Sequence, residues 1–132
     1  MNMYTDTVQV LNKVANTSNN FKLKTLPSCC SVVPVLKSSL SRVSYNEGDT
    51  ISIYFKYSEL LKLGYVPSKT YVGDEGTFTF RVKDYISDIL LPNLTDGDII
   101  DVKELKGLCK ITSVQTWKFG INSVLVVNCS GG

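Results

Sequence analysis

The sequence predicts an all-β fold class, β-rich with one short helix, arranged as a barrel of five to six strands. Apolar and polar residues alternate along residues 50–57 and 77–83, the pattern of strands with one buried and one solvated face. Residues 84–91 then follow helical spacing, and Pro92 prevents the helix from continuing. A helix of this length can cover one end of a barrel with its apolar face.

The composition indicates one globular domain without a membrane span. The chain has 132 residues, of which 43% are hydrophobic and 20% are charged. Its formal net charge of +2 permits an anionic partner, although duplex DNA binders that rely on charge are more basic. No apolar run approaches ~18 residues, and no basic segment precedes an apolar core at the N-terminus. We expect an intracellular protein without a membrane partner, cytoplasmic in a cell or in the host cytoplasm if viral.

The residues that most often perform catalysis or bind metal are missing or poorly spaced. Histidine is absent, which removes His-based acid–base chemistry and the commonest zinc ligand. The four cysteines are Cys29, Cys30, Cys109 and Cys129. An adjacent pair lacks the spacing of zinc ligands, and without a signal peptide we expect all four to be reduced. The sequence therefore predicts no enzyme, no catalytic residue, no metal and no cofactor.

Residues 1–30 differ in composition from residues 31–132. The first segment is rich in Asn, Thr and Ser and is predicted to be a polar N-terminal arm, while the second is predicted to be the barrel domain. Within the arm, apolar residues are spaced as one stripe of a two-turn helix, at Val8, Leu11, Val14 and Ala15. Such a helix is too short to be stable alone. It would dock either on its own barrel or on a neighbouring subunit.

The first half of the predicted barrel contains one clear strand. Pro34 lacks a backbone donor, so any strand near residues 32–36 is an edge or first strand. Along residues 50–57, the inward positions are Ile51, Ile53 and Phe55. Residues 59–63 are expected to form a single helical turn, capped by Ser58 and ended by Gly64. The long loop at 65–76 is a candidate functional loop.

The second half completes the predicted barrel. Phe78, Phe80 and Val82 are expected to point inward from residues 77–83, and Ile100 and Val102 from a strand at 98–103 that follows an Asp-Gly-Asp turn. A strand over residues 109–114 precedes a loop at 115–122. In the last strand, residues 123–129, the side chains expected on both faces are apolar, so both faces should be covered.

Residues 77–129 carry a resemblance to a known family. The stretch FTFRVKDYISDILLPNLTDGDIIDVKELKG and the later NSVLVVN resemble the second half of the oligonucleotide/oligosaccharide-binding (OB) fold in single-stranded-DNA-binding proteins. There a strand, a helix, a Gly-Asp turn into a fourth strand and a short last strand follow one another. The resemblance implies an OB-like barrel, although OB domains also bind RNA, sugars and proteins.

Proteins of this family that bind single strands combine a basic groove with aromatic stacking platforms. This sequence offers basic and aromatic residues at strand positions that are expected to face solvent, and in two loops. The candidate nucleic-acid-binding residues are Tyr54, Lys56, Arg81, Lys103, Lys69, Tyr71, Trp117, Lys118 and Phe119. Each also has an ordinary structural interpretation, as cross-strand packing for Tyr54 and as a solvated face for the cations.

Two functional hypotheses follow. The first is a non-catalytic protein that binds single-stranded nucleic acid, DNA before RNA, in viral or plasmid replication. The alternative is a small β-barrel structural or assembly protein, such as a virion component, which forms a homo-oligomer through its N-terminal arm. A nuclease with Mg²⁺ at Asp96, Asp98 and Asp101 is less favoured, because these residues are explained as turn and strand-start residues.

Overall fold

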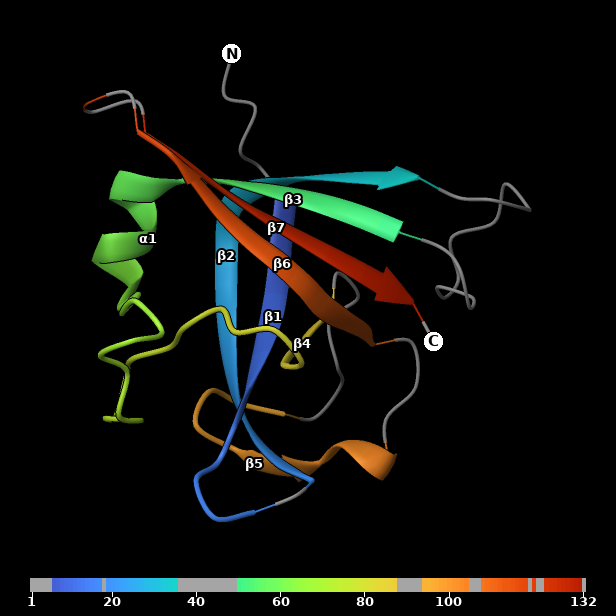
Figure 1. Ribbon diagram of the computed structural model, residues 1–132. Helices are drawn as coiled ribbons and strands as arrows, with labels where there is room; N and C mark the ends of the chain where they lie inside the picture. Colours follow the sequence, from blue (N-terminus) through green and yellow to red (C-terminus); the bar gives the residue numbers. More distant parts are fainter. Residues whose placement is uncertain are drawn as a thin grey trace.

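The computed structural model describes residues 6–17, 19–35, 50–87, 94–104, 108–118, 120 and 123–131. Within them the chain is mostly β-strand, with one short α-helix, which confirms the predicted fold class. The elements shown in Figure 1 are β1 (Asp6–Lys13), β2 (Asn20–Val35), β3 (Thr50–Lys56), α1 (Tyr57–Leu63), β4 (Tyr85–Ser87), β5 (Ile99–Asp101), a 3-10 helix η1 (Val102–Glu104), β6 (Cys109–Trp117) and β7 (Val124–Gly131). No helix in this described part is long and apolar enough to cross a membrane.

The strands form one antiparallel sheet that closes partly into a ring. Its order is β1-β4-β6-β7-β3-β2-β5, and β1 also pairs with β2, so every strand except β5 belongs to the ring. β2 makes the closure possible because it is long enough to have different neighbours along its length. Its residues 21–26 pair with β1, while on its other edge residues 20–22 pair with β5 and residues 30–35 with β3. The barrel-like architecture predicted from the strand patterns is therefore present.

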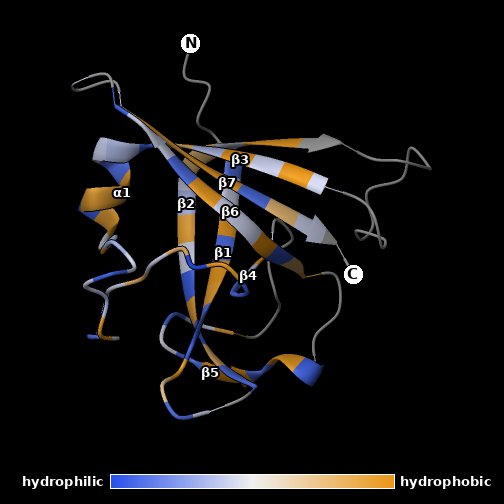
Figure 2. Ribbon diagram, in the orientation of Figure 1, coloured by the Kyte–Doolittle hydropathy of each residue, from blue (hydrophilic) through white to orange (hydrophobic). Residues whose placement is uncertain are grey.

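The core lies inside this ring. β3 alternates between buried and partly exposed positions as predicted, with Ile51, Ile53 and Phe55 buried. Leu125, Val126 and Val127 of β7 are all buried, which confirms that both faces of this strand are covered. Figure 2 shows hydrophobic and hydrophilic residues alternating along the strands. Each large apolar side chain that is buried in this way contributes roughly 1.5–3 kcal/mol to folding.

The polar N-terminal segment contains two strands of the sheet. The two-turn helix expected there is wrong, because residues 6–13 form β1, which pairs with β2 on one edge and with β4 on the other. Val8, Val10 and Leu11 are fully buried as a result. β2 then runs without a break past residue 30 into the segment assigned to the barrel domain. Pairing on both edges outweighs the weak helical spacing of a short segment.

The helix expected at residues 84–91 is also wrong in the part that the structure describes. Tyr85–Ser87 form β4, a short strand between β1 and β6, while residues 88–91 lie outside the described residues. Ile86 pairs with Val10 on one side and with Cys109 on the other, and its side chain is fully buried. The apolar spacing reflected burial in the barrel wall and not a helical face, an ambiguity that is common in short apolar runs.

Residues 77–83 do not form the predicted strand. They run as an extended segment with one isolated bridge, Phe78 to Tyr65, and a turn at residues 82–83. Phe78 and Phe80 are buried as expected, but Val82 is 56% exposed. The side chain of Asn12 replaces part of the missing ladder, since it donates to the Thr79 carbonyl at 2.7 Å and accepts from the Thr79 N–H at 3.0 Å.

The helical turn predicted at residues 59–63 is present as α1, which starts slightly earlier. Lys56, and not Ser58, stands at its N-terminal cap, without a side-chain hydrogen bond. Gly64 ends the helix in the left-handed region, at φ 107°. A Cβ at Gly64 would overlap the carbonyl oxygen of Gly76, so glycine is needed here for space as well as for conformation.

The C-terminal strands differ from prediction mainly in their ends. The strand expected at residues 98–103 is shorter, because β5 gives way to η1 at Val102. Ile100 is buried as predicted, and Val102 is partly buried. β6 is longer than expected and includes Gln115–Trp117, which had been assigned to a loop. β7 follows the predicted last strand closely.

Candidate functional site

Three neighbouring hollows lie where the β1–β2 hairpin meets the segments around residues 71–76 and 81–84. The central hollow has a volume of about 640 Å³, within the ~300–1,000 Å³ usual for ligand sites. It shares Lys13 and Arg81 with a second hollow of about 470 Å³, and Lys22 and Glu75 with a third of about 170 Å³. The three hollows are therefore adjacent, and together we call them the basic groove.

Basic side chains line the groove along its length. They are Lys24, Lys22, Lys13, Arg81 and Lys83, and the acidic side chains beside them are Asp96, Glu75 and Asp84. Two of the cations are paired, Lys24 with Asp96 at 3.9 Å and Arg81 with Asp84 at 2.9 Å. The ion pairs among the described residues do not include Lys13, Lys22 or Lys83. These ammonium groups are accordingly available to an anionic ligand.

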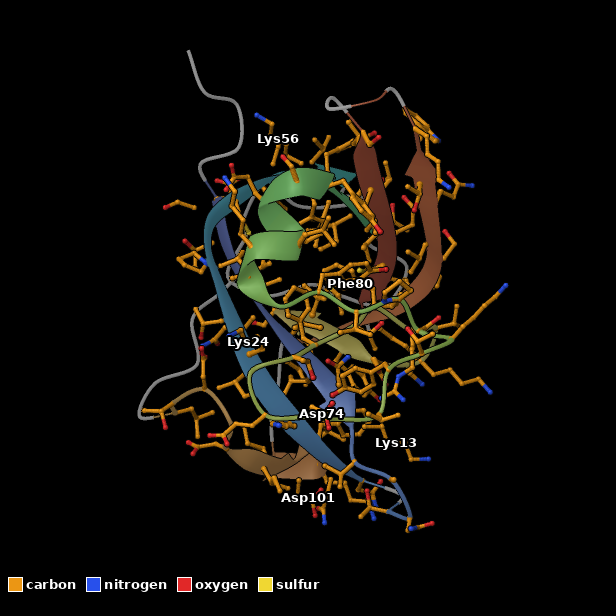
Figure 3. All side chains as sticks on the ribbon, turned by 90° about the vertical axis from the view of Figure 1, so that its left-hand side faces the viewer. Lys13, Lys24, Lys56, Asp74, Phe80 and Asp101 are labelled. Atoms are coloured by element: carbon orange, nitrogen blue, oxygen red, sulfur yellow. The ribbon has the colours of Figure 1, made fainter. Side chains whose placement is uncertain are left out.

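The strand pattern of β2 explains where Lys22 and Lys24 point. Phe21 and Leu23 are buried in a small second core, so Lys22 and Lys24, which alternate with them, point to the opposite side of the sheet, where they pair with Asn12 and Val10 of β1. Asp96 and Gly97 hold this edge of β2 in place, because the Thr25 N–H donates to the Asp96 carboxylate at 2.7 Å and the Gly97 N–H donates to the Leu23 carbonyl at 2.9 Å. In Figure 3 the loop that carries Asp74 crosses in front of β1 and β2, between Lys24 and Lys13.

Arg81 connects the walls of the groove. Its Nε donates to Asp84 Oδ2 at 2.9 Å, and its Nη2 donates to the Lys13 carbonyl at 3.0 Å. Its guanidinium carbon also lies 5.2 Å from the centroid of the Tyr71 ring. One side chain thus joins the end of β1, the segment before β4 and the loop that carries Tyr71.

Asp84 and Asn12 form the buried base of this connection. Asp84 is 3% exposed and accepts a second hydrogen bond at Oδ2, from Asn12 Nδ2 at 2.9 Å. Its other oxygen lies 3.4 Å from the Lys13 backbone nitrogen, which donates to it. A buried carboxylate needs such partners, because an unpaired charge in the interior is strongly destabilising. The buried Asp84 carboxylate, itself held by Asn12, therefore fixes the position of the Arg81 guanidinium.

Tyr71 supplies an aromatic surface in the central hollow. Its side chain is half-buried, and this burial raises the pKa of its hydroxyl above the ordinary value while Arg81 opposes the rise. The hydroxyl is therefore protonated at neutral pH and can donate a hydrogen bond. A neutral ring beside cations suits stacking against a planar base.

Among the sequence-predicted site residues that the structure describes, Tyr71 and Arg81 are the two that line the groove. Lys69 is exposed on the same loop, and Lys103 is exposed on η1, but neither lines the groove. Phe119 lies outside the described residues.

The other predicted residues share a different surface. Lys56 pairs with Val124, which pairs with Trp117, so these side chains point to the same side of the sheet, and Tyr54 lies on that side two residues earlier. We call this surface, formed by Tyr54, Lys56 and Trp117, the outer face. Trp117 is 49% exposed there, and Lys118 is exposed directly after it.

Most residues of the groove were not predicted from the sequence. Lys13, Lys22, Lys24, Lys83 and Glu75 were not among the candidates. The alternation Phe-Lys-Leu-Lys at residues 21–24 is the signal that could have found two of them, since it is the pattern of a half-buried strand with a basic face. That signal lay within the segment interpreted as a polar arm.

The four cysteine thiols do not form a metal-binding cluster in the described residues. All four cysteines are buried and free, in agreement with the prediction. Burial raises the pKa of Cys129, which keeps this thiol protonated, whereas a hydrogen bond from Cys30 lowers the pKa of Cys29. Across the described residues, no three Cys, Asp or Glu side chains come together in a way that could hold a metal ion.

No protein-family model, no curated protein and no solved structure matches this chain. The resemblance to OB-fold single-stranded-DNA-binding proteins therefore stays a prediction, and the function is argued from the chemistry of the groove.

Proposed function

We propose that this protein is a non-catalytic binding protein for single-stranded nucleic acid and that the strand lies in the basic groove. The observation that supports this most strongly is the row of three adjacent hollows, in which basic side chains recur and Tyr71 offers a ring. Proteins that bind single strands without strict sequence preference need both features, a cationic track for the phosphates and an aromatic platform for a base.

The spacing of the cations also suits a strand. Lys22 and Lys24 stand two residues apart on β2, roughly 7 Å along the strand, so each can contact a different phosphate. Lys13 stands at the end of β1, one residue after Asn12, which pairs with Lys22, and it lines the central hollow together with Lys22. Lys83 extends the track beyond Arg81 into the second hollow. The resemblance to single-stranded-DNA-binding proteins favours DNA over RNA and a role in viral or plasmid replication, in the cytoplasm.

The test is fluorescence anisotropy with a labelled thirty-nucleotide oligo(dT) strand and with a duplex of the same length, over a range of salt concentrations. The protein should bind the single strand more tightly than the duplex. The double variant Lys13→Glu/Lys22→Glu should bind the single strand at least tenfold more weakly than the wild type. The slope of log K against log salt should flatten by about 0.7 for each phosphate that the variant no longer neutralises. Lys62→Glu together with Lys69→Glu is the matched control, because both residues are exposed and lie outside the groove.

Two results count against the proposal. If the wild-type protein does not bind the strand at micromolar concentration in low salt, the protein is not a single-strand binder. If the groove pair and the control pair weaken binding equally, the strand is held by overall charge and not by this groove.

A second candidate function, assembly, is favoured by the outer face. Trp117 is 49% exposed and Val33 is 45% exposed on the same side of the sheet. The N-terminal segment is a less suitable contact than expected, because deleting residues 1–20 would remove β1 and its buried side chains. We therefore place any contact between copies on the outer face. Sedimentation of the wild type and of Trp117→Ala decides this candidate, since a monomeric wild type excludes it.

A further inference from the structure

We propose that the basic groove contains a subsite that prefers guanine, formed by Tyr71 and Glu75 in the central hollow. This inference rests on the proposed binding of single strands. It adds a specificity that a cationic track with an aromatic ring does not supply, because phosphates and ring faces are common to all nucleotides.

Glu75 is the residue in the groove that charge alone does not explain. An acidic side chain in a site for an anion weakens binding unless it has a partner. The other two acids have structural partners, since Asp84 pairs with Arg81 and Asp96 pairs with Lys24. Glu75 is exposed and lines both the central hollow and the third one. The hydrogen bonds and ion pairs of the described residues give it no partner.

The central hollow places this carboxylate beside a stacking surface. Tyr71 and Glu75 both line it, and the guanidinium carbon of Arg81 lies 5.2 Å from the centroid of the Tyr71 ring. A base stacked on Tyr71 would therefore present its edge to groups that line the same hollow. Lys13 and Lys22, which also line it, would meet the phosphates on either side of that base.

Guanine is the base whose edge fits a carboxylate best. An ionised carboxylate only accepts hydrogen bonds, through two oxygens. The Watson–Crick edge of guanine carries two adjacent donors, N1–H and the N2 amino group, so it can donate to both oxygens at once. Adenine and cytosine each present a single amino group there, and thymine a single N–H. Single-stranded bases are recognised through this edge in many complexes.

The experiment compares twelve-nucleotide oligo(dT) strands that carry one central guanine, inosine or adenine. We expect the guanine strand to bind about tenfold more tightly than the adenine strand, equivalent to about 1.4 kcal/mol. Inosine should be intermediate, because it keeps N1–H and lacks the N2 amino group. Glu75→Gln should reduce the preference, expressed as the ratio of the guanine and adenine affinities of the same variant, to less than about twofold. Asp74→Asn is the matched control, because it removes the same charge from the adjacent residue, which does not line the central hollow.

The outcomes separate the two proposals. If oligo(dT) binds and the guanine strand binds no more tightly than the adenine strand, the subsite is refuted and the single-strand function stands. A preference that survives Glu75→Gln, or that Asp74→Asn removes equally, refutes the role of Glu75. If no strand binds, the proposed function itself fails.

Discussion

Replacing Arg81 by alanine should test the network beneath the groove. The substitution removes the 2.9 Å hydrogen bond to Asp84, the 3.0 Å hydrogen bond to the Lys13 carbonyl and the contact with the Tyr71 ring. It leaves the Asp84 carboxylate buried, with only Asn12 and a long bond from the Lys13 N–H as partners. Removing one partner of a fully buried ion pair costs about 3–5 kcal/mol.

The expected destabilisation by Arg81→Ala is smaller, because the Arg81 side chain is 33% exposed and water can partly replace it. We expect about 2–3 kcal/mol in the free energy of unfolding, measured by urea denaturation at pH 7. Lys62→Ala is the matched control, since Lys62 and Glu59 form another pair three residues apart, at 3.6 Å, with both side chains largely exposed. The control should be destabilised by less than about 0.5 kcal/mol.

The difference between the two variants decides whether the network supports the structure. If Arg81→Ala is no more destabilising than Lys62→Ala, Asp84 does not depend on Arg81 and the network is not a structural support. Arg81→Lys should fall between the wild type and Arg81→Ala, because an ammonium keeps the charge and cannot make both hydrogen bonds in the same planar geometry.

Three further predictions concern stability. Phe55→Ala should lower the free energy of unfolding by about 3–5 kcal/mol in urea, because Phe55 is fully buried, whereas Lys56→Ala should change it by less than about 0.5 kcal/mol. Gly64→Ala should be more destabilising than Gly73→Ala in the same assay, because both have positive φ but only a Cβ at residue 64 would overlap a backbone carbonyl. Burial raises the pKa of Tyr65 to about 12, so stability is retained below pH ~10 and falls as the pH rises toward 12. Tyr65→Phe should reduce this loss of stability above pH ~10. If the free energy of unfolding of the variant falls with pH as steeply as that of the wild type, the prediction is contradicted.

The strand patterns predicted the barrel wall where burial alternates cleanly. Ile51, Ile53 and Phe55 were assigned correctly because β3 has one face in the core and one toward solvent. Gly64 identified the end of α1 for a local reason, the need for a left-handed residue. Both signals depend only on neighbouring residues, which is why the sequence alone contained them.

Other elements depended on partners that are distant in sequence. Tyr85–Ser87 form a strand because β1 and β6 lie on either side of them, and no local pattern indicates those neighbours. In residues 77–83, the backbone groups of Thr79 are bonded by the side chain of Asn12, far earlier in the chain, and not by a neighbouring strand. The same limit applies to the candidate site. Arg81 and Tyr71 were recognised by residue type, but Lys13 and Lys22 join them only through the hairpin of β1 and β2.

The central claim is that a single nucleic-acid strand occupies the basic groove, and mapping by NMR tests it most directly. Titration of ¹⁵N-labelled protein with unlabelled oligo(dT) should shift the backbone amide signals of residues 12–15, 22–24, 71–75 and 81–83, which line or border the groove. Signals of Tyr54, Lys56 and Trp117 on the outer face should stay in place. Shifts concentrated on those three residues, with the groove signals unmoved, would contradict the account.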